Sequence, residues 1–94
     1  MKLEHYKSNY ESWYYLDKND NKVYHRDDDL PAIIYPNRLK VWYQHGKFHR
    51  EIGAAREYSN EELEYWYHGK FLGRSYEGYT QEKFKQYIKL LLFL

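Results

Sequence analysis

The chain repeats itself, and this repetition constrains its fold more than any other feature. Shifted by 23 positions, the segment from Pro31 to Phe48 aligns without a gap onto Ala54 to Phe71, and seven of the eighteen positions are identical. The identical pairs are Ala32/Ala55, Tyr35/Tyr58, Asn37/Asn60, His45/His68, Gly46/Gly69, Lys47/Lys70 and Phe48/Phe71. A repeat this short is one supersecondary unit that buries its apolar face only against its neighbours. The sequence therefore predicts a stacked array.

Other matches indicate a third, less regular copy nearer the start of the chain. His25-Arg26 matches His49-Arg50, and each pair is followed by an acidic residue. Trp13-Tyr14 matches Trp42-Tyr43, with about five extra residues around 17–21 before the next His-Arg pair. The array should therefore contain two clear copies preceded by a degenerate one.

Each copy carries the signals of short strands and tight turns. Expected strands cover 32–35 and 39–44 in one copy, and 55–58 and 63–67 in the next. His45-Gly46 and His68-Gly69 are turn signals, because glycine readily adopts positive φ. Links this short favour antiparallel pairing, since a parallel crossover needs a dozen or more residues. We expect a mainly β fold, an antiparallel β-meander of six to eight strands in tandem hairpin repeats; an irregular, loop-rich domain is the alternative.

The last fifteen residues have a different pattern, that of a helix. Thr80 is a suitable N-cap, and Gln81 and Glu82 suit the positive end of the helix dipole. Apolar residues then follow at helical spacing, with lysines on the other side. The apolar positions are Phe84, Tyr87, Ile88, Leu91 and Leu92. We expect one domain over residues 1–94, with hairpin repeats over 12–78 and one C-terminal helix over 80–94.

Composition excludes several classes of function. The chain has no cysteine, which removes disulfides, thiolate nucleophiles and cysteine-type zinc sites. A formal net charge of +1 gives no general attraction to nucleic acid or membranes. The longest apolar stretch, Leu90–Leu94, is far too short to span a bilayer, and the first residues contain no secretory signal. We expect a cytoplasmic protein without a membrane partner.

The segment from Trp42 to Ala55 resembles a known repeat, written W-Y-x-x-G-K-x-H-R-x-x-G-P-A. This repeat is found in small proteins of tailed bacteriophages and large DNA viruses and is distantly similar to MORN-type β-hairpin repeats. The resemblance covers roughly residues 13–73. Ala54 departs from the pattern, which has proline there. The resemblance implies a β-hairpin array and a viral or phage accessory role, without an established chemistry.

Adjacent aromatic residues form two ladders when the copies are aligned. Because successive side chains on a strand point to opposite faces, each ladder belongs to one face of the sheet. One ladder consists of Trp13, Trp42 and Tyr65, and the other of Tyr14, Tyr43 and Trp66. A single sheet cannot bury both faces completely, so some rings should remain exposed for recognition. The sequence leaves open which ladder is buried; we take Tyr14, Tyr43 and Trp66 as partner-binding candidates.

The histidines occur at equivalent repeat positions, which favours a structural role over metal binding or catalysis. His45 and His49 are four residues apart, but a glycine turn separates them, so they do not share a helical face. The His-Arg-acid units could form a polar ladder in which arginine pairs with carboxylates and histidine donates to a backbone carbonyl. An anion site is the functional alternative, so Arg26 and Arg50 are also partner-binding candidates. We expect no metal, no cofactor and no catalytic residue.

These features favour a non-catalytic viral or phage accessory protein that binds a host protein, plausibly a defence protein that it inhibits. The alternative is a nucleic-acid or nucleotide binder that stacks bases on exposed rings and contacts phosphates through Arg26, Arg50, Arg56 and the lysines of the tail. A hydrolase that uses His49 is a third, weaker alternative. Leu90, Phe93 and Leu94 extend the apolar surface of the expected helix beyond one stripe. They suggest a homodimer through the C-terminal helix.

Overall fold

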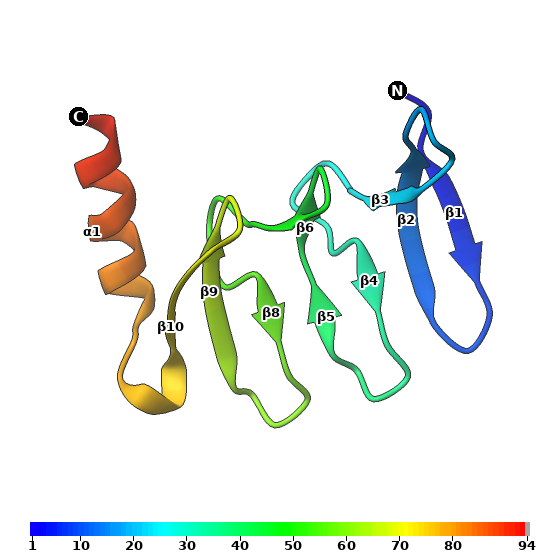
Figure 1. Cartoon of the computed structure of the whole chain (residues 1–94). Helices are drawn as coiled ribbons and strands as arrows, with labels where there is room; N and C mark the ends of the chain where they lie inside the picture. The colour runs from blue at the N-terminus through cyan, green and yellow to red at the C-terminus, as the bar shows by residue number, and fades with distance from the viewer. Residues whose placement is uncertain (94) are drawn as a thin grey trace.

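The computed structural model describes residues 1–93 as a row of antiparallel hairpins with a helix at one end (Figure 1). The main sheet has eight strands, and every pair is antiparallel. Its order is β1 (Glu4–Lys7), β2 (Glu11–Leu16), β4 (Ile33–Ile34), β5 (Lys40–Val41), β8 (Arg56–Glu57), β9 (Leu63–Tyr67) and β10 (Lys70–Arg74), and β3 (Lys22–Tyr24) also pairs with β2. The strands β6 (Tyr43–Gln44) and β7 (Lys47–Phe48) form a separate pair. The 3₁₀ helix η1 (Ser75–Glu77) and the helix α1 (Gln81–Leu92) follow β10.

The predicted mainly β fold with a C-terminal helix is confirmed, but the described residues form ten strands rather than six to eight, and one predicted strand is divided. Residues 39–44 form β5 and β6, which meet at Trp42. The Trp42 amide donates to the carbonyl of Ala55 at 2.7 Å, while the Trp42 carbonyl accepts from the amide of His49 at 3.1 Å. Before Trp42 the chain pairs with β4 and β8 in the main sheet, and after Trp42 it pairs with β7. In the same way, the Trp13 amide donates to the carbonyl of Ala32, and the Trp13 carbonyl accepts from the amide of His25.

The positive φ predicted for the glycines of the two histidine-glycine turns is confirmed, and the histidines before them also have positive φ. His45 and Gly46 have φ of 49° and 79°, and His68 and Gly69 have φ of 47° and 82°. Two central residues with positive φ define a type I′ turn, whose twist matches that of the flanking strands. These turns fix the registers of the β6–β7 and β9–β10 hairpins.

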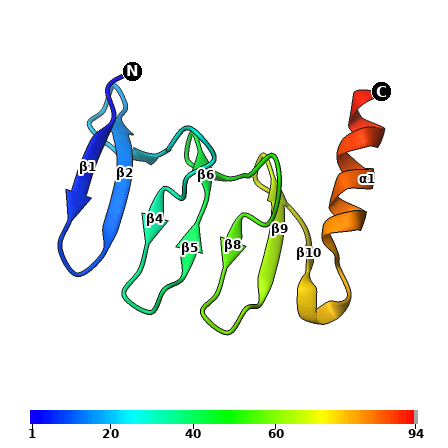
Figure 2. The same ribbon diagram turned by 180° about the vertical axis from the view of Figure 1, so that it is seen from behind.

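The helix lies at the end of the row opposite β1 (Figures 1 and 2). The Thr80 hydroxyl accepts a hydrogen bond from the amide of Lys83 at 3.1 Å, so the predicted N-cap is confirmed. Phe84 is 1% exposed and packs with Tyr65 and Ala54 in the buried core. The described helix ends at Leu92, and Leu94 lies outside the described residues. The helix therefore covers the last repeat, where no further hairpin follows.

The tip of the helix is uncovered. The residues Leu90, Leu91, Leu92 and Phe93 are 66%, 38%, 79% and 86% exposed. Within residues 1–93, no helix is long and apolar enough to cross a membrane.

The docking of the helix should depend on Phe84. We expect Phe84→Ala to lower the free energy of unfolding by about 3–5 kcal/mol, because the change removes a buried ring and leaves a cavity. The exposed Leu92 provides the control, and Leu92→Ala should change the free energy by less than about 0.5 kcal/mol. Urea denaturation followed by circular dichroism measures both values. Equal effects of the two changes would contradict the docked position of the helix.

Candidate functional site

The two faces of the sheet are used differently. The side chains of Trp42 and Tyr65 are 6% and 2% exposed and lie on the face that the helix joins. The next residue along each strand, Tyr43 or Trp66, points to the opposite face and is only half-buried. The sequence left open which ladder is buried. The structure buries Trp42 and Tyr65 of one ladder and leaves its third member, Trp13, half-buried. All three members of the other ladder, Tyr14, Tyr43 and Trp66, are half-buried.

The face opposite Trp42 and Tyr65 carries a continuous row of rings, which we call the aromatic face. Three equivalent hairpins each contribute one cross-strand pair of rings to it. The pairs are Tyr14 with Tyr24, Tyr43 with Phe48, and Trp66 with Phe71. Within the pairs the ring centroids are 6.5, 4.9 and 5.2 Å apart, and between neighbouring pairs they are 5.5 and 4.8 Å apart. Five of the six rings are half-buried, and Phe71 is exposed. The row therefore crosses all three repeats without a break.

At one end of this row, two arginines pair with a carboxylate on the same face. The Glu64 carboxylate accepts from Arg56 at 3.5 Å and from Arg74 at 3.3 Å, and the Trp66 indole nitrogen donates to it at 3.2 Å. Burial of the carboxyl opposes its ionisation, but the indole hydrogen bond and the two guanidinium groups together hold the pKa of Glu64 below its ordinary value. Arg56 and Arg74 lie 5.2 and 4.6 Å from the rings of Phe48 and Phe71. Arg74 also donates to Glu77 at 3.0 Å, so two carboxylates offset the two guanidinium groups at this end of the aromatic face.

The five residues predicted to bind a partner do not form one surface. Tyr14, Tyr43 and Trp66 share the aromatic face, whereas Arg26 and Arg50 lie on the other side of the sheet. The Arg26 guanidinium is 3.4 Å from the ring centre of Trp13, and that of Arg50 is 3.9 Å from Trp42. Because Trp13 and Trp42 precede Tyr14 and Tyr43 in their strands, the arginines cover the opposite ladder.

The polar groups of Arg50 are used within the fold. Arg50 donates to both carboxylate oxygens of Asp29, at 2.8 and 3.1 Å, and to Glu57 at 2.9 Å. It also donates to the carbonyl of Ala54 at 3.2 Å. Burial alone would lower the pKa of Arg50, but hydrogen bonds and charges from Asp29 and Glu57 hold this pKa above its ordinary value. The geometry assigns Arg50 to the support of Trp42 rather than to an anion site.

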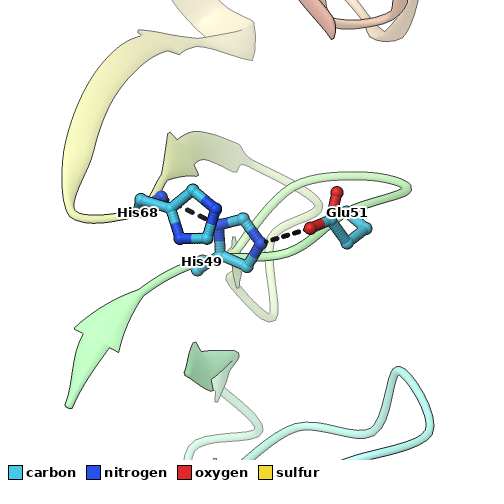
Figure 3. Close-up of side chains that lie close together, drawn as sticks. All are labelled: His49, Glu51 and His68. Carbon is cyan, nitrogen blue, oxygen red and sulfur yellow. Dashed lines mark hydrogen bonds and ion pairs between the residues drawn. The ribbon is translucent and has the colours of Figure 1, made fainter. Parts of the chain in front are cut away.

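Each buried histidine connects one hairpin to the turn of the next. His49 Nδ1 accepts from the backbone amide of His68 at 2.8 Å, and its Nε2 donates to Glu51 at 2.9 Å (Figure 3). His25 repeats the arrangement, accepting from the amide of His45 at 3.1 Å and donating to Asp27 at 2.8 Å. The expected structural role fits this geometry, but the expected donation to a backbone carbonyl is wrong. The imidazole accepts from an amide because the I′ turn leaves that N–H pointing at it.

The cluster of His49, Glu51 and His68 has donors suited to a metal ion, and these lie within 4.8 Å of one another. Its geometry does not fit one. A neutral imidazole that accepts a hydrogen bond at Nδ1 carries its proton at Nε2, so His49 has no lone pair left for a metal. The ring of His68 is stacked on it at 3.8 Å and 18°, so their in-plane lone pairs cannot converge. For the same reason His49 is unsuited to accept a proton as a catalytic base.

A hollow of about 540 Å³ lies between the loops that carry Arg26 and Arg50. Groups of both charges line it, including residues 27–29, His45 and Glu51. Several already have partners: Asp29 binds Arg50, and the His45 ring is hydrogen-bonded to the Tyr15 hydroxyl at 2.9 Å. This hollow lies on the side of the stacked arginines, away from the aromatic face.

Sequence reasoning missed half of the aromatic face, namely Tyr24, Phe48 and Phe71. A signal for two of them was present, because Phe48 and Phe71 are identical residues at equivalent repeat positions. A two-residue turn at His45-Gly46 pairs Gln44 with Lys47 and hence Tyr43 with Phe48. The turn type and the register together therefore identify these rings.

Comparisons with protein-family models, with curated proteins and with solved structures find no significant match.

The stability of the fold should decrease in mild acid because of His49. Burial lowers the pKa of His49 from its ordinary value of 6.5, so the folded state resists the proton that the unfolded chain accepts. Stability from this group is present above pH 6.5 and is lost as the pH falls below it. We expect His49→Gln, which keeps an acceptor and a donor but does not titrate, to flatten the decrease between pH 7.5 and 5.5. Urea denaturation at each pH tests this, and parallel curves for the two proteins would contradict it.

Proposed function

We propose that this chain is a non-catalytic binding protein and that its recognition surface is the aromatic face. The continuous row of six partly exposed rings carries the proposal. Tyrosine and tryptophan provide large contact area with little conformational freedom to lose, and they dominate the energetics of protein interfaces. The opposite face has an evident internal use, because arginines and the helix cover it. On the aromatic face cations lie beside single rings only, Lys22 beside Tyr14, Arg56 beside Phe48 and Arg74 beside Phe71, and every ring keeps part of its surface exposed.

The partner that we propose is a protein rather than a nucleic acid. A nucleic-acid surface needs free cations along the path of the phosphates. On the aromatic face the carboxylates of Glu64 and Glu77 offset the charges of Arg56 and Arg74, and Lys22 lies at the other end of the row, 4.6 Å from the ring centre of Tyr14. Arg50, a residue that the nucleic-acid alternative requires, is paired with Asp29 and Glu57 on the other side. Both observations favour an uncharged protein surface as the ligand.

The biological setting that we propose comes from the resemblance of the repeat alone. The resemblance suggests that the chain is a viral or phage accessory protein, acts in the host cytoplasm, and inhibits a host defence protein by binding it. The absence of cysteine is compatible with a reducing compartment.

The proposal can be tested by comparing the proteins captured by matched variants. Phe71 is exposed, and Tyr43 is half-buried in the middle of the row, so Tyr43→Ser combined with Phe71→Ser removes much of the surface. Leu30→Ser combined with Ile52→Ser removes similar exposed apolar groups from the loops that follow Arg26 and Arg50. We expect the first variant to lose, by at least about tenfold, a host protein that the parent and the control variant capture.

The capture is carried out in lysate with and without nuclease, and the captured proteins are quantified by mass spectrometry. Nuclease should leave the capture unchanged. Loss of capture after nuclease treatment would favour the nucleic-acid alternative. Identical capture by the two variants would remove the aromatic face as the binding surface.

We also propose that the tip of α1 joins two copies of the chain. Four consecutive apolar residues, 90–93, are exposed there, which is unusual on the surface of a monomer. Light scattering should give twice the mass of the 11.8 kDa chain, and Leu90→Ser combined with Leu92→Ser should give the monomer. A monomeric parent at micromolar concentration would exclude the dimer.

A further inference from the structure

The spacing of the aromatic pairs indicates the conformation of a ligand that could contact all of them. Strands β2, β5 and β9 belong to the three repeats and lie two positions apart in the main sheet. Neighbouring strands are about 4.8 Å apart, so successive repeats advance by about 10 Å. A polyproline II helix rises 3.1 Å per residue with three residues per turn, or about 9.3 Å per turn. A peptide in this conformation, lying across the strands, would place one residue of each turn against each ring pair.

The hydroxyl groups of the aromatic face complement the backbone of such a peptide. Within residues 1–93 the hydroxyls of Tyr14, Tyr24 and Tyr43 make no hydrogen bond to the protein. A polyproline II helix has no internal hydrogen bonds, so all its carbonyl groups need donors from water or from a partner. Proline also lacks the N–H group, which leaves the peptide with acceptors only. A surface of tyrosine hydroxyls supplies the donors that this backbone lacks.

The charge of the face points the same way. Glu64 and Glu77 together offset Arg56 and Arg74, so the end of the row near Trp66 offers little net charge to an acidic ligand. An uncharged and preordered peptide avoids the cost of desolvating ions and loses little conformational freedom on binding. The flat rings meet the flat pyrrolidine rings of proline over a broad apolar contact.

We propose that the aromatic face binds proline-rich segments in the polyproline II conformation. This inference rests on the proposed binding function and names the chemistry of the partner. The three cross-strand pairs act as three successive contact positions, each engaged by one turn of the peptide. The first two pairs supply hydroxyl donors, and Trp66 with Phe71 supplies an apolar contact. Binding therefore depends on peptide length, because each added turn reaches one more pair.

The experiment is a nuclear magnetic resonance titration of the full chain with synthetic peptides. Dodecaproline is the probe, hexaproline tests length, and a twelve-residue glycine-serine peptide is the unstructured control. We expect dodecaproline to shift the signals of the six ring residues and of the Trp66 indole, with hexaproline at least about tenfold weaker. Tyr43→Ser combined with Phe71→Ser should abolish the shifts, and Leu30→Ser combined with Ile52→Ser should retain them.

The outcomes separate this inference from the function on which it rests. Equal binding of the glycine-serine peptide, or shifts confined to other residues, overturns the inference. Absence of oligoproline binding, with capture of a host protein that still depends on Tyr43 and Phe71, overturns the inference and leaves the proposed function standing. Absence of both overturns the two together.

Discussion

A hydrogen bond from the backbone of a turn to a buried imidazole links each repeat to the next, in addition to the strand pairing of the main sheet. The rings of His25 and His49 accept this hydrogen bond from the amides of His45 and His68, and each ring donates a second hydrogen bond to a carboxylate. The bond requires a neutral ring, a turn with positive φ and a hairpin of fixed register. Because the register decides which side chains face each other, the row of cross-strand rings follows from the same contact.

The two faces of the sheet have divided tasks as a result. Arg26 and Arg50 stack on Trp13 and Trp42. In the last repeat Gly73 stands at the position equivalent to Arg50, and Phe84 packs on Tyr65 instead. The side chains on the face of Trp13, Trp42 and Tyr65 are therefore occupied by contacts within the array. The opposite face keeps its rings partly exposed. Because 21% of the residues are aromatic, enough other rings remain to fill the core.

The features that depend on local sequence could be predicted, whereas those that depend on contacts between residues distant in the chain could not. The repeat, the position of the histidine-glycine turns and the Thr80 cap each depend on residues within one hairpin or one helical turn, so the sequence alone was sufficient to predict them. The roles of Arg26 and Arg50 could not be read in this way. A guanidinium that follows a histidine by one residue can point to a solvent-exposed site or fold back over a tryptophan of an earlier strand. Asp29 and Glu57, which hold Arg50 in place, are distant from it by 21 and 7 residues. The division of residues 39–44 at Trp42 also depends on two separate partner strands.

The bridging histidine also makes the length of the array easy to change. The imidazole that accepts the hydrogen bond belongs to one repeat, and the amide that donates it belongs to the next. Any two repeats of this kind can therefore be linked by the same hydrogen bond. Duplication of one 23-residue unit within the row would preserve every such junction and leave the helix at the end. It would also lengthen the row of rings by one pair. Evolution can thus adjust the reach of this surface in whole steps, by gene duplication, without redesigning a core.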